Sequence, residues 1–359
     1  MANGTVYRRD DRKKPWVVHV SWFEGDRRRQ SKKSYSTKKE AQEALATAID
    51  AHRRQEFVAP TDLRVRDFVD TWLHALETQG RKVTTVTGYR QAMKNWVLPH
   101  LGTHKLQELR ATDLDKLYAD LLRAGGVGGR PLSMTTVHHV HTLLGTMLHD
   151  AERRGLVVRN VARLADAPSM AAARDRAPEM NVWSPDELSR FLRYVESYRA
   201  GALVHLAAMT GMRRGELVAL RWDAVDLARS TVTVRAAASF LGGVERVEVP
   251  KTKRSRRTID LDQRTASILK RHRATQREEL FELGMTAPTD DRVFTNEVGD
   301  PMRPHSVGQA FNRLVESSGL ARIRLHDLRH THASHLLAAG VNAKVVSERL
   351  GHSSVSFTL

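Results

Sequence analysis

Two short segments in the C-terminal half could act together on an anionic group. The first, Thr210–Leu217, holds Arg213 and Glu216. Residues three apart share one face of a helix, so this carboxylate can orient this guanidinium. The second, Lys251–Arg257, holds five cations in seven residues between two candidate strands. We interpret it as the tip of a β-hairpin, where cations are either solvated or placed against nucleic-acid phosphate.

Histidines mark two further segments. In His326–His332, the three-residue spacing places His326 beside Arg329 on one face of a helix that begins here. The other segment, Leu350–His352, predicts a helix that ends at a glycine cap and is followed by an exposed histidine. We treat the four segments together as one candidate site.

A zinc site is the alternative use of these histidines. Its four candidate ligands are His326, His330, His332 and His335. The chain has no cysteine and no His-Glu-x-x-His pattern, so the usual zinc ligand sets are missing from the sequence. We therefore expect no metal site. The glycine-rich run at 125–129 matches neither a P-loop nor a dinucleotide fingerprint, and we expect it to be a loop.

The charge of the whole chain favours a polyanionic partner. Lys and Arg number 58 against 41 Asp and Glu, a formal net charge of +17. Cations placed against phosphates release condensed counterions, which favours nucleic acid. Residues 1–20 show no signal-peptide pattern, and no apolar run is long enough to span a bilayer, so we expect no membrane partner. The absence of cysteine fits a reducing compartment, and we expect a cytoplasmic, nucleoid-associated protein.

The expected fold is multidomain and mainly α, with small β-sheets. Residues 1–60 combine two strand-like runs with a helix that opens at a Thr37–Glu40 capping box, which predicts a β-sheet plus helix module. Residues 61–166 show four amphipathic helices and predict a compact bundle. A proline- and alanine-containing linker is expected at 167–182, followed by an α+β domain at 183–359.

Strand-like alternation recurs within the last domain. It covers residues 231–235, 244–249 and 258–261, and helical patterns surround these runs. The basic segment described above lies between the second and third of them. This arrangement is the basis for the hairpin interpretation.

The N-terminal module is also strongly basic. Between Arg8 and Lys39 there are twelve basic and four acidic residues. Strands that could lie in a DNA groove favour DNA contact over a face that is merely solvated. The candidate DNA contacts are Arg27, Arg28, Arg29, Lys32 and Lys33 in this module, and Lys253, Arg254, Arg256 and Arg257 in the C-terminal domain.

The four segments of the candidate site resemble the catalytic boxes of the tyrosine recombinases, the phage integrases. They read Thr-Gly-Met-Arg-Arg-Gly-Glu-Leu, Pro-Lys-Thr-Lys, His-Asp-Leu-Arg-His-Thr and Leu-Gly-His-Ser-Ser, in this order. The resemblance implies an arm-DNA-binding domain of three strands plus a helix at 1–60, a core-DNA-binding domain at 61–166 and a catalytic domain at 183–359. It further implies a site-specific recombinase that integrates or excises a mobile element. The implied partners are double-stranded attachment sites, a homotetramer formed on DNA, and DNA-bending and directionality factors.

The resemblance also implies a mechanism without cofactor. A tyrosine hydroxyl attacks a DNA phosphodiester, which yields a 3′-phosphotyrosyl link and a free 5′-hydroxyl. Arg213 and Arg329 would stabilise the charge on the phosphoryl group, because a guanidinium fork matches phosphate oxygens and stays charged. Lys251 would protonate the departing 5′-oxygen, and Lys253 is the second candidate for that role.

Two histidines, a carboxylate and a tyrosine complete the implied site. His326 and His352 would donate hydrogen bonds to phosphate or move the nucleophile's proton, a role suited to an imidazole pKa of about 6.5. Glu216 would orient the site without reacting. The family's nucleophilic tyrosine follows the Leu-Gly-His box, whereas all six tyrosines of this sequence precede it. We therefore expect a chain truncated before its nucleophile, which binds DNA without cleaving it.

Two other functions stay open at this point. A DNA-binding regulator on the same scaffold explains the charge and the missing tyrosine, but not the arginines, lysine and histidines at the catalytic positions. A metal-dependent nuclease built on the histidine cluster is the second. A covalent protein–DNA adduct distinguishes a recombinase from a regulator, and sensitivity to a chelator distinguishes the nuclease.

Overall fold

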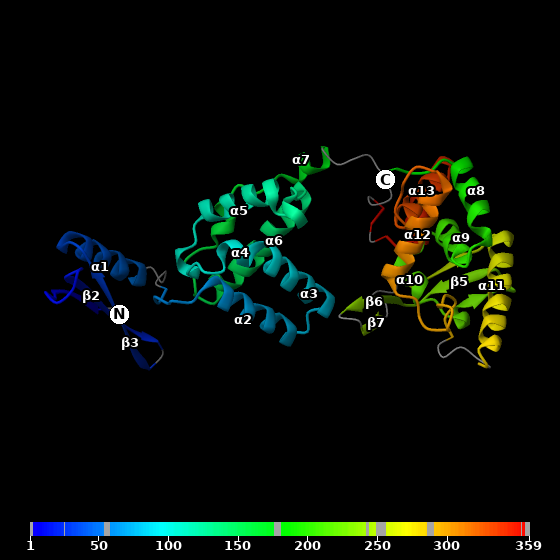
Figure 1. Ribbon diagram of the computed structural model, residues 1–359. Coiled ribbons are helices and arrows are strands. Elements are labelled where there is room, and N and C mark those ends of the chain that lie inside the picture. The colour runs from blue at the N-terminus through cyan, green and yellow to red at the C-terminus, as the bar shows by residue number, and fades with distance from the viewer. Residues whose placement is uncertain are drawn as a thin grey trace. The chain divides into compact units, whose positions relative to one another are not determined.

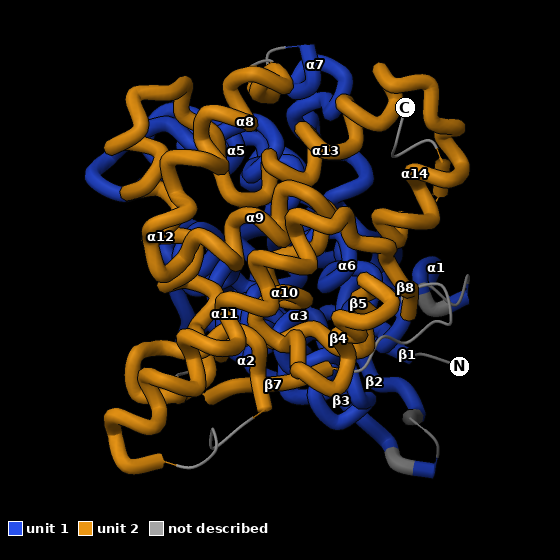
Figure 2. The backbone as a smooth tube through the Cα atoms, turned by 90° about the vertical axis from the view of Figure 1, so that its right-hand side faces the viewer, with its two compact units in different colours: residues 1–177 blue, residues 178–359 orange. Residues whose placement is uncertain are grey.

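The chain folds into two compact units, Met1–Ala177 and Pro178–Leu359, coloured separately in Figure 2. The computed structural model describes residues 3–24, 26–53, 58–175, 181–241, 244–248, 256–285, 291–352 and 354–355. These residues are mostly helical with small antiparallel sheets, which confirms the predicted fold class (Figure 1). The helices described are all too short or too polar to cross a bilayer.

The first unit begins with a three-stranded antiparallel sheet and one helix. These elements are β1 (Asn3–Arg8), β2 (Trp16–Glu24), β3 (Arg27–Tyr35) and α1 (Lys38–Arg53). Alternation along β2 buries Val18 and Val20 against Ala41 of α1. The capping box is confirmed, because the Glu40 amide donates to Thr37 Oγ1 at 3.2 Å and the Thr37 amide donates to Glu40 Oε2 at 3.3 Å. The predicted sheet-plus-helix module is present.

The rest of the first unit is helical. Its elements are α2 (Val65–Thr78), α3 (Val83–Ala92), η1 (Met93–Val97), α4 (Leu98–Leu101), η2 (Leu106–Glu108), α5 (Ala111–Ala124), η3 (Val127–Gly129), α6 (Met134–Arg153) and η4 (Val161–Leu164). The apolar stripes predicted for the four amphipathic helices face one core that includes Trp72, Leu114 and Met147. Trp72 Nε1 also donates to Asp150 Oδ2 at 2.8 Å, which ties α2 to α6.

A short helix, α7 (Met170–Asp175), lies within the segment predicted to be a linker. Ala173 is buried, and α7 contacts α6. The His138 Nδ1 atom of α6 lies 2.9 Å from the carbonyl oxygen of Pro168. The first part of the predicted linker is therefore packed structure, because alanine favours a helix wherever one face can be covered. Residues 176–180 lie outside the described part of the chain.

The second unit surrounds a helix that is buried on nearly all sides. Its helices are α8 (Pro185–Tyr194), η5 (Val195–Ser197), α9 (Gly201–Thr210), α10 (Arg214–Val218), η6 (Trp222–Ala224), α11 (Gln263–Glu282), α12 (Pro304–Ser318), α13 (Asp327–Ala338) and α14 (Ala343–Leu350). Helix α9 is apolar all round and packs against α8, α10, α11 and α13. The ends of α9, α10, α13 and α14 carry the candidate site.

Two small sheets complete this unit. They consist of β4 (Val225–Asp226), β5 (Thr231–Val234) and β8 (Arg257–Asp260) in one sheet, and β6 (Ala237–Leu241) and β7 (Val244–Glu248) in the other. Strand β8 pairs with β5, whereas β7 pairs with β6. The hairpin interpretation is therefore wrong for the residues that the structure describes, because β7 and β8, the strands on either side of the basic segment, belong to different sheets. Alternation identifies a strand but not its partner, and the sequence analysis did not find β6.

Candidate active site

A glycine turn after α9 brings the first arginine to the site. Gly211 adopts the left-handed conformation (φ 63°), and a Cβ atom there would collide with the side chain of Leu350. Only glycine meets both conditions without strain. The turn ends α9 and places Arg213 at the N-cap of α10.

Arg213 and Glu216 interact as their spacing predicts. Arg213 Nη1 donates to Glu216 Oε1 at 2.9 Å, and the Arg213 amide donates to Glu216 Oε2 at 2.8 Å. The Glu216 side chain is only 6% exposed, whereas that of Arg213 is 42% exposed. The carboxylate thus anchors a guanidinium that remains accessible from solvent.

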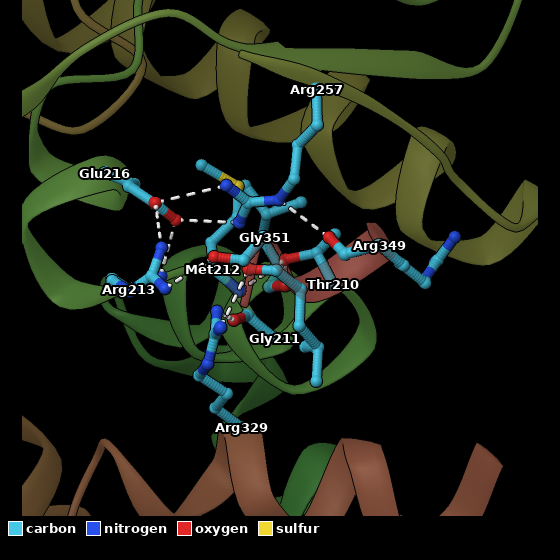
Figure 3. Close-up of polar contacts among 11 residues, drawn as sticks. Thr210, Gly211, Met212, Arg213, Glu216, Arg257, Arg329, Arg349 and Gly351 are labelled. Atoms are coloured by element: carbon cyan, nitrogen blue, oxygen red, sulfur yellow. Dashed lines mark hydrogen bonds and ion pairs between the residues drawn. The ribbon is translucent and has the colours of Figure 1, made fainter. Parts of the chain in front are cut away.

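Arg257 occupies the other side of the same carboxylate, as Figure 3 shows. Its Nη1 and Nη2 atoms donate to Glu216 Oε1 and Oε2 at 3.1 and 2.8 Å. Arg257 was predicted to contact DNA phosphate, and this prediction is wrong, because its side chain is 6% exposed and forms a buried ion pair. Strand β8 buries Arg257 and Ile259 and exposes the two residues that alternate with them. That alternation was the signal in the sequence that could have revealed the burial.

The Glu216 carboxylate is held in its charged form. Burial alone would raise the pKa of Glu216, but hydrogen bonding and charge from Arg257, followed by Arg213, hold that pKa below its ordinary value. Glu216 therefore stays ionised while it orients both arginines.

Arg329 is a buried cation in the first turn of α13. It is 3% exposed, and its Nη1 and Nη2 atoms donate to the carbonyl oxygens of Gly211 and Leu350, both at 2.7 Å. Burial, followed by the nearby charge of Arg213, lowers the pKa of Arg329 to about 9. In the part of the chain that the structure describes, no carboxylate pairs directly with it. A buried cation in such a position gains from an added anion.

Three arginines contact three successive carbonyl groups at the end of α14. Arg257 Nε donates to the Arg349 carbonyl at 2.6 Å, and Arg213 Nη2 donates to the Gly351 carbonyl at 2.8 Å (Figure 3). The bond from Arg329 to the Leu350 carbonyl lies between them. Sequence reasoning missed this arrangement, because each bond joins segments about 20 to 140 positions apart.

The surroundings of the two predicted site histidines lower the pKa of both imidazoles. His352 is half-buried, so the prediction of an exposed histidine after Gly351 is wrong. Burial, then the charges of Arg329 and Arg213, lowers the pKa of His352 to about 4. Burial, then the neighbouring His330, also lowers the pKa of His326. Both pKa values therefore lie below the value of about 6.5 that the sequence analysis expected, and both imidazoles are neutral at pH 7.

The four histidines weighed as zinc ligands have separate partners. The rings of His326 and His330 lie edge to face with centroids 5.2 Å apart. His332 Nε2 accepts from Arg349 Nε at 3.2 Å, and His335 Nε2 lies 2.8 Å from the carbonyl oxygen of Trp183. Among the described residues, no three His, Asp or Glu side chains are grouped as metal ligands.

The predicted lysine cannot be placed. Lys251, with Lys253 and Arg254, lies outside the described residues. Arg256 is described and exposed, at the edge of the same segment. These residues remain predictions.

The N-terminal basic residues fall on two faces of one sheet. In the register of β2 and β3, Arg28 and Lys32 lie opposite Phe23 and His19. Arg29 and Lys33 lie opposite Trp22 and Val18, on the face that α1 covers. Arg27 lies at the start of β3. The sequence analysis treated all five cations as one surface, and the sheet separates them.

Comparisons with known proteins identify the family of the chain. A family model described as "Phage integrase family" matches residues 181–359, and one described as "Phage integrase, N-terminal SAM-like domain" matches residues 65–122. An integrase from Streptomyces ambofaciens is 28% identical over 97% of this chain and 89% of its own length. A protein named tyrosine recombinase XerC-like from Caldanaerobacter subterraneus subsp. tengcongensis is 26% identical over 90% of this chain and 84% of its own length.

Solved structures share the fold. The Tn1549 transposon integrase in complex with a circular intermediate DNA superposes with a TM-score of 0.70 at 19% identity, over 83% of this chain and 94% of that one. A lambda integrase dimer bound to a COC′ core site gives a TM-score of 0.62 at 14% identity, over 98% and 93% of the two chains. These matches show that the chain belongs to the phage integrase family of tyrosine recombinases, whose function is site-specific DNA recombination.

Proposed function

We propose that the second unit cleaves and rejoins DNA at attachment sites through a 3′-phosphotyrosyl intermediate, to integrate or excise a mobile element. The observation that supports this proposal best is the net positive charge of the arginine cluster. Arg213, Arg257 and Arg329 gather around the single carboxylate of Glu216, so their local balance is 3 − 1 = +2. A phosphodiester supplies an anion whose oxygens match guanidinium forks.

The proposed chemistry exchanges one phosphoester for another. The tyrosine oxygen attacks phosphorus, the bond from phosphorus to the 5′-oxygen breaks, and the leaving oxygen takes up a proton. Arg213 and Arg329 stabilise the charge that builds on the non-bridging oxygens. We propose that Lys251 donates this proton. Because the covalent link keeps the phosphoester for the return step, this scheme needs no metal ion or nucleotide.

The neutral histidines suit the start of this reaction. A neutral imidazole can accept the tyrosine proton with one nitrogen and donate to a phosphate oxygen with the other. His352 lies close enough to Arg213 and Arg329 for their charges to lower its pKa, which supports a place beside the phosphate for it. We propose His326 as the second hydrogen-bond donor.

We propose that the nucleophile is none of the six tyrosines in this sequence. The hydroxyl groups of Tyr194 and Tyr198 lie 2.9 Å from each other, and the buried Tyr118 hydroxyl lies 3.0 Å from His141 Nδ1. Tyr89 stacks on Trp72 in the core of the helical bundle. The other two tyrosines, at positions 7 and 35, belong to the N-terminal sheet. On this proposal the present chain binds DNA without cleaving it.

The proposed partners are double-stranded core and arm attachment sites. The Tn1549 integrase neighbour was solved with a circular intermediate DNA, and lambda integrase was solved as a dimer on a core site and as a tetramer on a Holliday junction. These relatives support a homotetramer on DNA for this chain, with DNA-bending and directionality factors as further partners. The predicted arm-binding and core-binding roles of residues 1–60 and 61–166 follow the same analogy.

A suicide substrate tests the proposed function. A duplex with a nick shortly after the scissile phosphate loses the short fragment that carries the free 5′-hydroxyl, and this loss traps the covalent 3′-phosphotyrosyl intermediate. The full-length gene product should form an adduct that survives denaturation and is unaffected by EDTA, and the present chain should form none. A full-length protein that binds the site but forms no adduct would be a regulator, and EDTA-sensitive cleavage would identify a nuclease.

A further inference from the structure

We propose that Arg257 is a positioning residue for DNA cleavage: it holds the Glu216 carboxylate and the last turn of α14 together, and so aligns Arg213 with His352. This inference rests on the proposed recombinase function. It replaces the sequence-based prediction that Arg257 contacts DNA directly.

Every nitrogen of the Arg257 guanidinium has a partner inside the protein. Nη1 and Nη2 donate to the two oxygens of Glu216, and Nε donates to the Arg349 carbonyl. With all three nitrogens engaged in the protein, Arg257 does not present donors to a DNA backbone. It acts through the groups that it touches, whereas the Arg213 side chain beside it is 42% exposed and can reach a phosphate.

The end of α14 is built around this guanidinium. Gly351 caps the helix with φ 69°, and a Cβ atom there would lie 3.2 Å from Arg257 Nη1. The guanidinium therefore packs directly against the backbone that leads to His352. The last carbonyl groups of a helix lack partners within the helix, and donors from a cation satisfy them well. Arg257 supplies the first of the three arginine bonds to these carbonyls.

In the described residues, the side chains of Arg213 and Arg329 donate to protein groups through Nη1 and Nη2, which leaves Nε for a phosphate, whereas Arg257 donates through Nε, Nη1 and Nη2. When DNA is bound, the bonds from the first two arginines to the α14 carbonyls compete with the phosphate oxygens. The bond from Arg257 to the Arg349 carbonyl does not face that competition. Arg257 is thus the contact that keeps α14 in register with the site throughout the reaction.

The same unit contains a matched control. Arg292 is also buried, and its Nη1 and Nη2 atoms donate to the two oxygens of Glu245 at 2.6 and 3.0 Å. Its Nη1 atom also donates to the Val218 carbonyl, at the end of α10, at 2.9 Å. Arg292 therefore repeats the chemistry of Arg257, a carboxylate plus the carbonyl at the end of a helix. It does not contact α14, and on α10 it contacts the end opposite to the Arg213 N-cap.

The experiment compares Arg257→Lys with Arg292→Lys in the full-length gene product. Lysine keeps the charge but cannot form the three-point fork. On the suicide substrate, we expect Arg257→Lys to slow single-turnover cleavage by about 100-fold, the scale of a misplaced catalytic group, while site affinity changes less than about threefold. Arg292→Lys should keep cleavage within about threefold of wild type when rates are compared at equal folded fraction. Equal cleavage losses in the two variants would overturn the proposal.

Two further readouts separate positioning from stability. Amide hydrogen exchange in the last turn of α14 should accelerate in Arg257→Lys and stay at the wild-type rate in Arg292→Lys. In a double-mutant cycle with Glu216→Gln, the Arg257→Lys effect on cleavage should shrink, whereas the Arg292→Lys effect should be additive. If the wild-type protein forms no adduct, the proposed recombinase function fails. Unchanged exchange in α14 would then reject the positioning role independently.

Discussion

At the scale of single residues, the main feature of the site is an excess of positive charge over the one carboxylate of Glu216. Glu216 neutralises one guanidinium and shares its two oxygens between Arg213 and Arg257. Arg329 is more deeply buried and donates only to carbonyl groups in the described residues. A buried charge without a paired ion is unfavourable, so the fold carries an electrostatic arrangement that the proposed phosphate substrate would relieve.

Replacing Arg329 or Arg213 by alanine should separate cleavage from binding. In the proposed mechanism each guanidinium stabilises charge that develops mainly in the transition state, and removal of one such donor typically slows the chemical step by about 100- to 1,000-fold. In the full-length protein, Arg213→Ala and Arg329→Ala should retain most of the attachment-site affinity in a mobility-shift assay while the adduct disappears. Binding losses as large as the activity losses would argue against a transition-state role.

A buried histidine makes stability depend on pH. His332 is 8% exposed, and its Nε2 atom accepts a hydrogen bond from Arg349, which requires an unprotonated nitrogen. Burial, followed by the charge of Arg349, lowers the pKa of His332 to about 4 from about 6.5. Since the folded state has the lower pKa, this stabilisation is complete above about pH 6.5 and is lost as the pH falls towards about 4.

The free energy of unfolding, measured in urea between pH 7 and pH 5, should therefore fall with decreasing pH. His332→Gln should flatten this slope by removing one titrating group, and His74→Gln, at an exposed position on α2, serves as the control. An unchanged slope in His332→Gln would contradict the assignment.

At the scale of elements, individual helices and strands could be predicted from the sequence better than the pairing and packing between them. The amphipathic helices and the Thr37–Glu40 capping box depend on neighbours a few residues away, and these were predicted correctly. The alternation of Arg257 with Ile259 in the sequence already indicated that Arg257 is buried. The sequence analysis expected β8 to pair with the strand that precedes the basic segment, whereas it pairs with β5. Burial, followed by the charges of Arg329 and Arg213, lowers the pKa of His352, and both arginines lie far away in the sequence, so no local pattern could show it.

The two faces of the N-terminal sheet should differ in their contribution to arm-site binding. Arg28 and Lys32 extend from the face opposite α1, where the His19 Nε2 atom also lies 2.9 Å from the Gln30 side-chain oxygen. This open face can approach a DNA groove, whereas α1 packs against the other face of the sheet, where Arg29 and Lys33 are exposed at the edge strand.

The double substitution of Arg28 and Lys32 by alanine should weaken arm-site binding and reduce the salt slope by about two, because each of these cations neutralises one phosphate. The matched pair Arg29→Ala and Lys33→Ala should leave the slope near the wild-type value. Fluorescence anisotropy at several salt concentrations measures both. Equal slopes for the two double variants would mean that the sheet contacts DNA by its edge.

At the scale of the whole molecule, the sequence carries its positive charge in regions with separate cores. The N-terminal sheet and α1 enclose one small cluster, the helical bundle encloses a second, and the catalytic unit encloses a third. Twelve of the 58 basic residues lie between positions 8 and 39. Since each region has its own core, the other regions do not need the basic N-terminal module for folding, and this module can contribute additional DNA contacts.

Deleting residues 1–60 should therefore weaken binding to arm sites far more than binding to the crossover core. The loss at arm sites should come with a smaller salt slope, because the phosphates that these cations neutralise keep their counterions when the module is gone. The bundle and the catalytic unit retain their own cores, so thermal unfolding of the shortened protein should remain cooperative. Competition between arm and core duplexes, measured for the full chain and the deletion at equal salt, gives the two losses directly. If both sites lose affinity equally, residues 1–60 act as a general electrostatic anchor and not as a separate arm-binding domain.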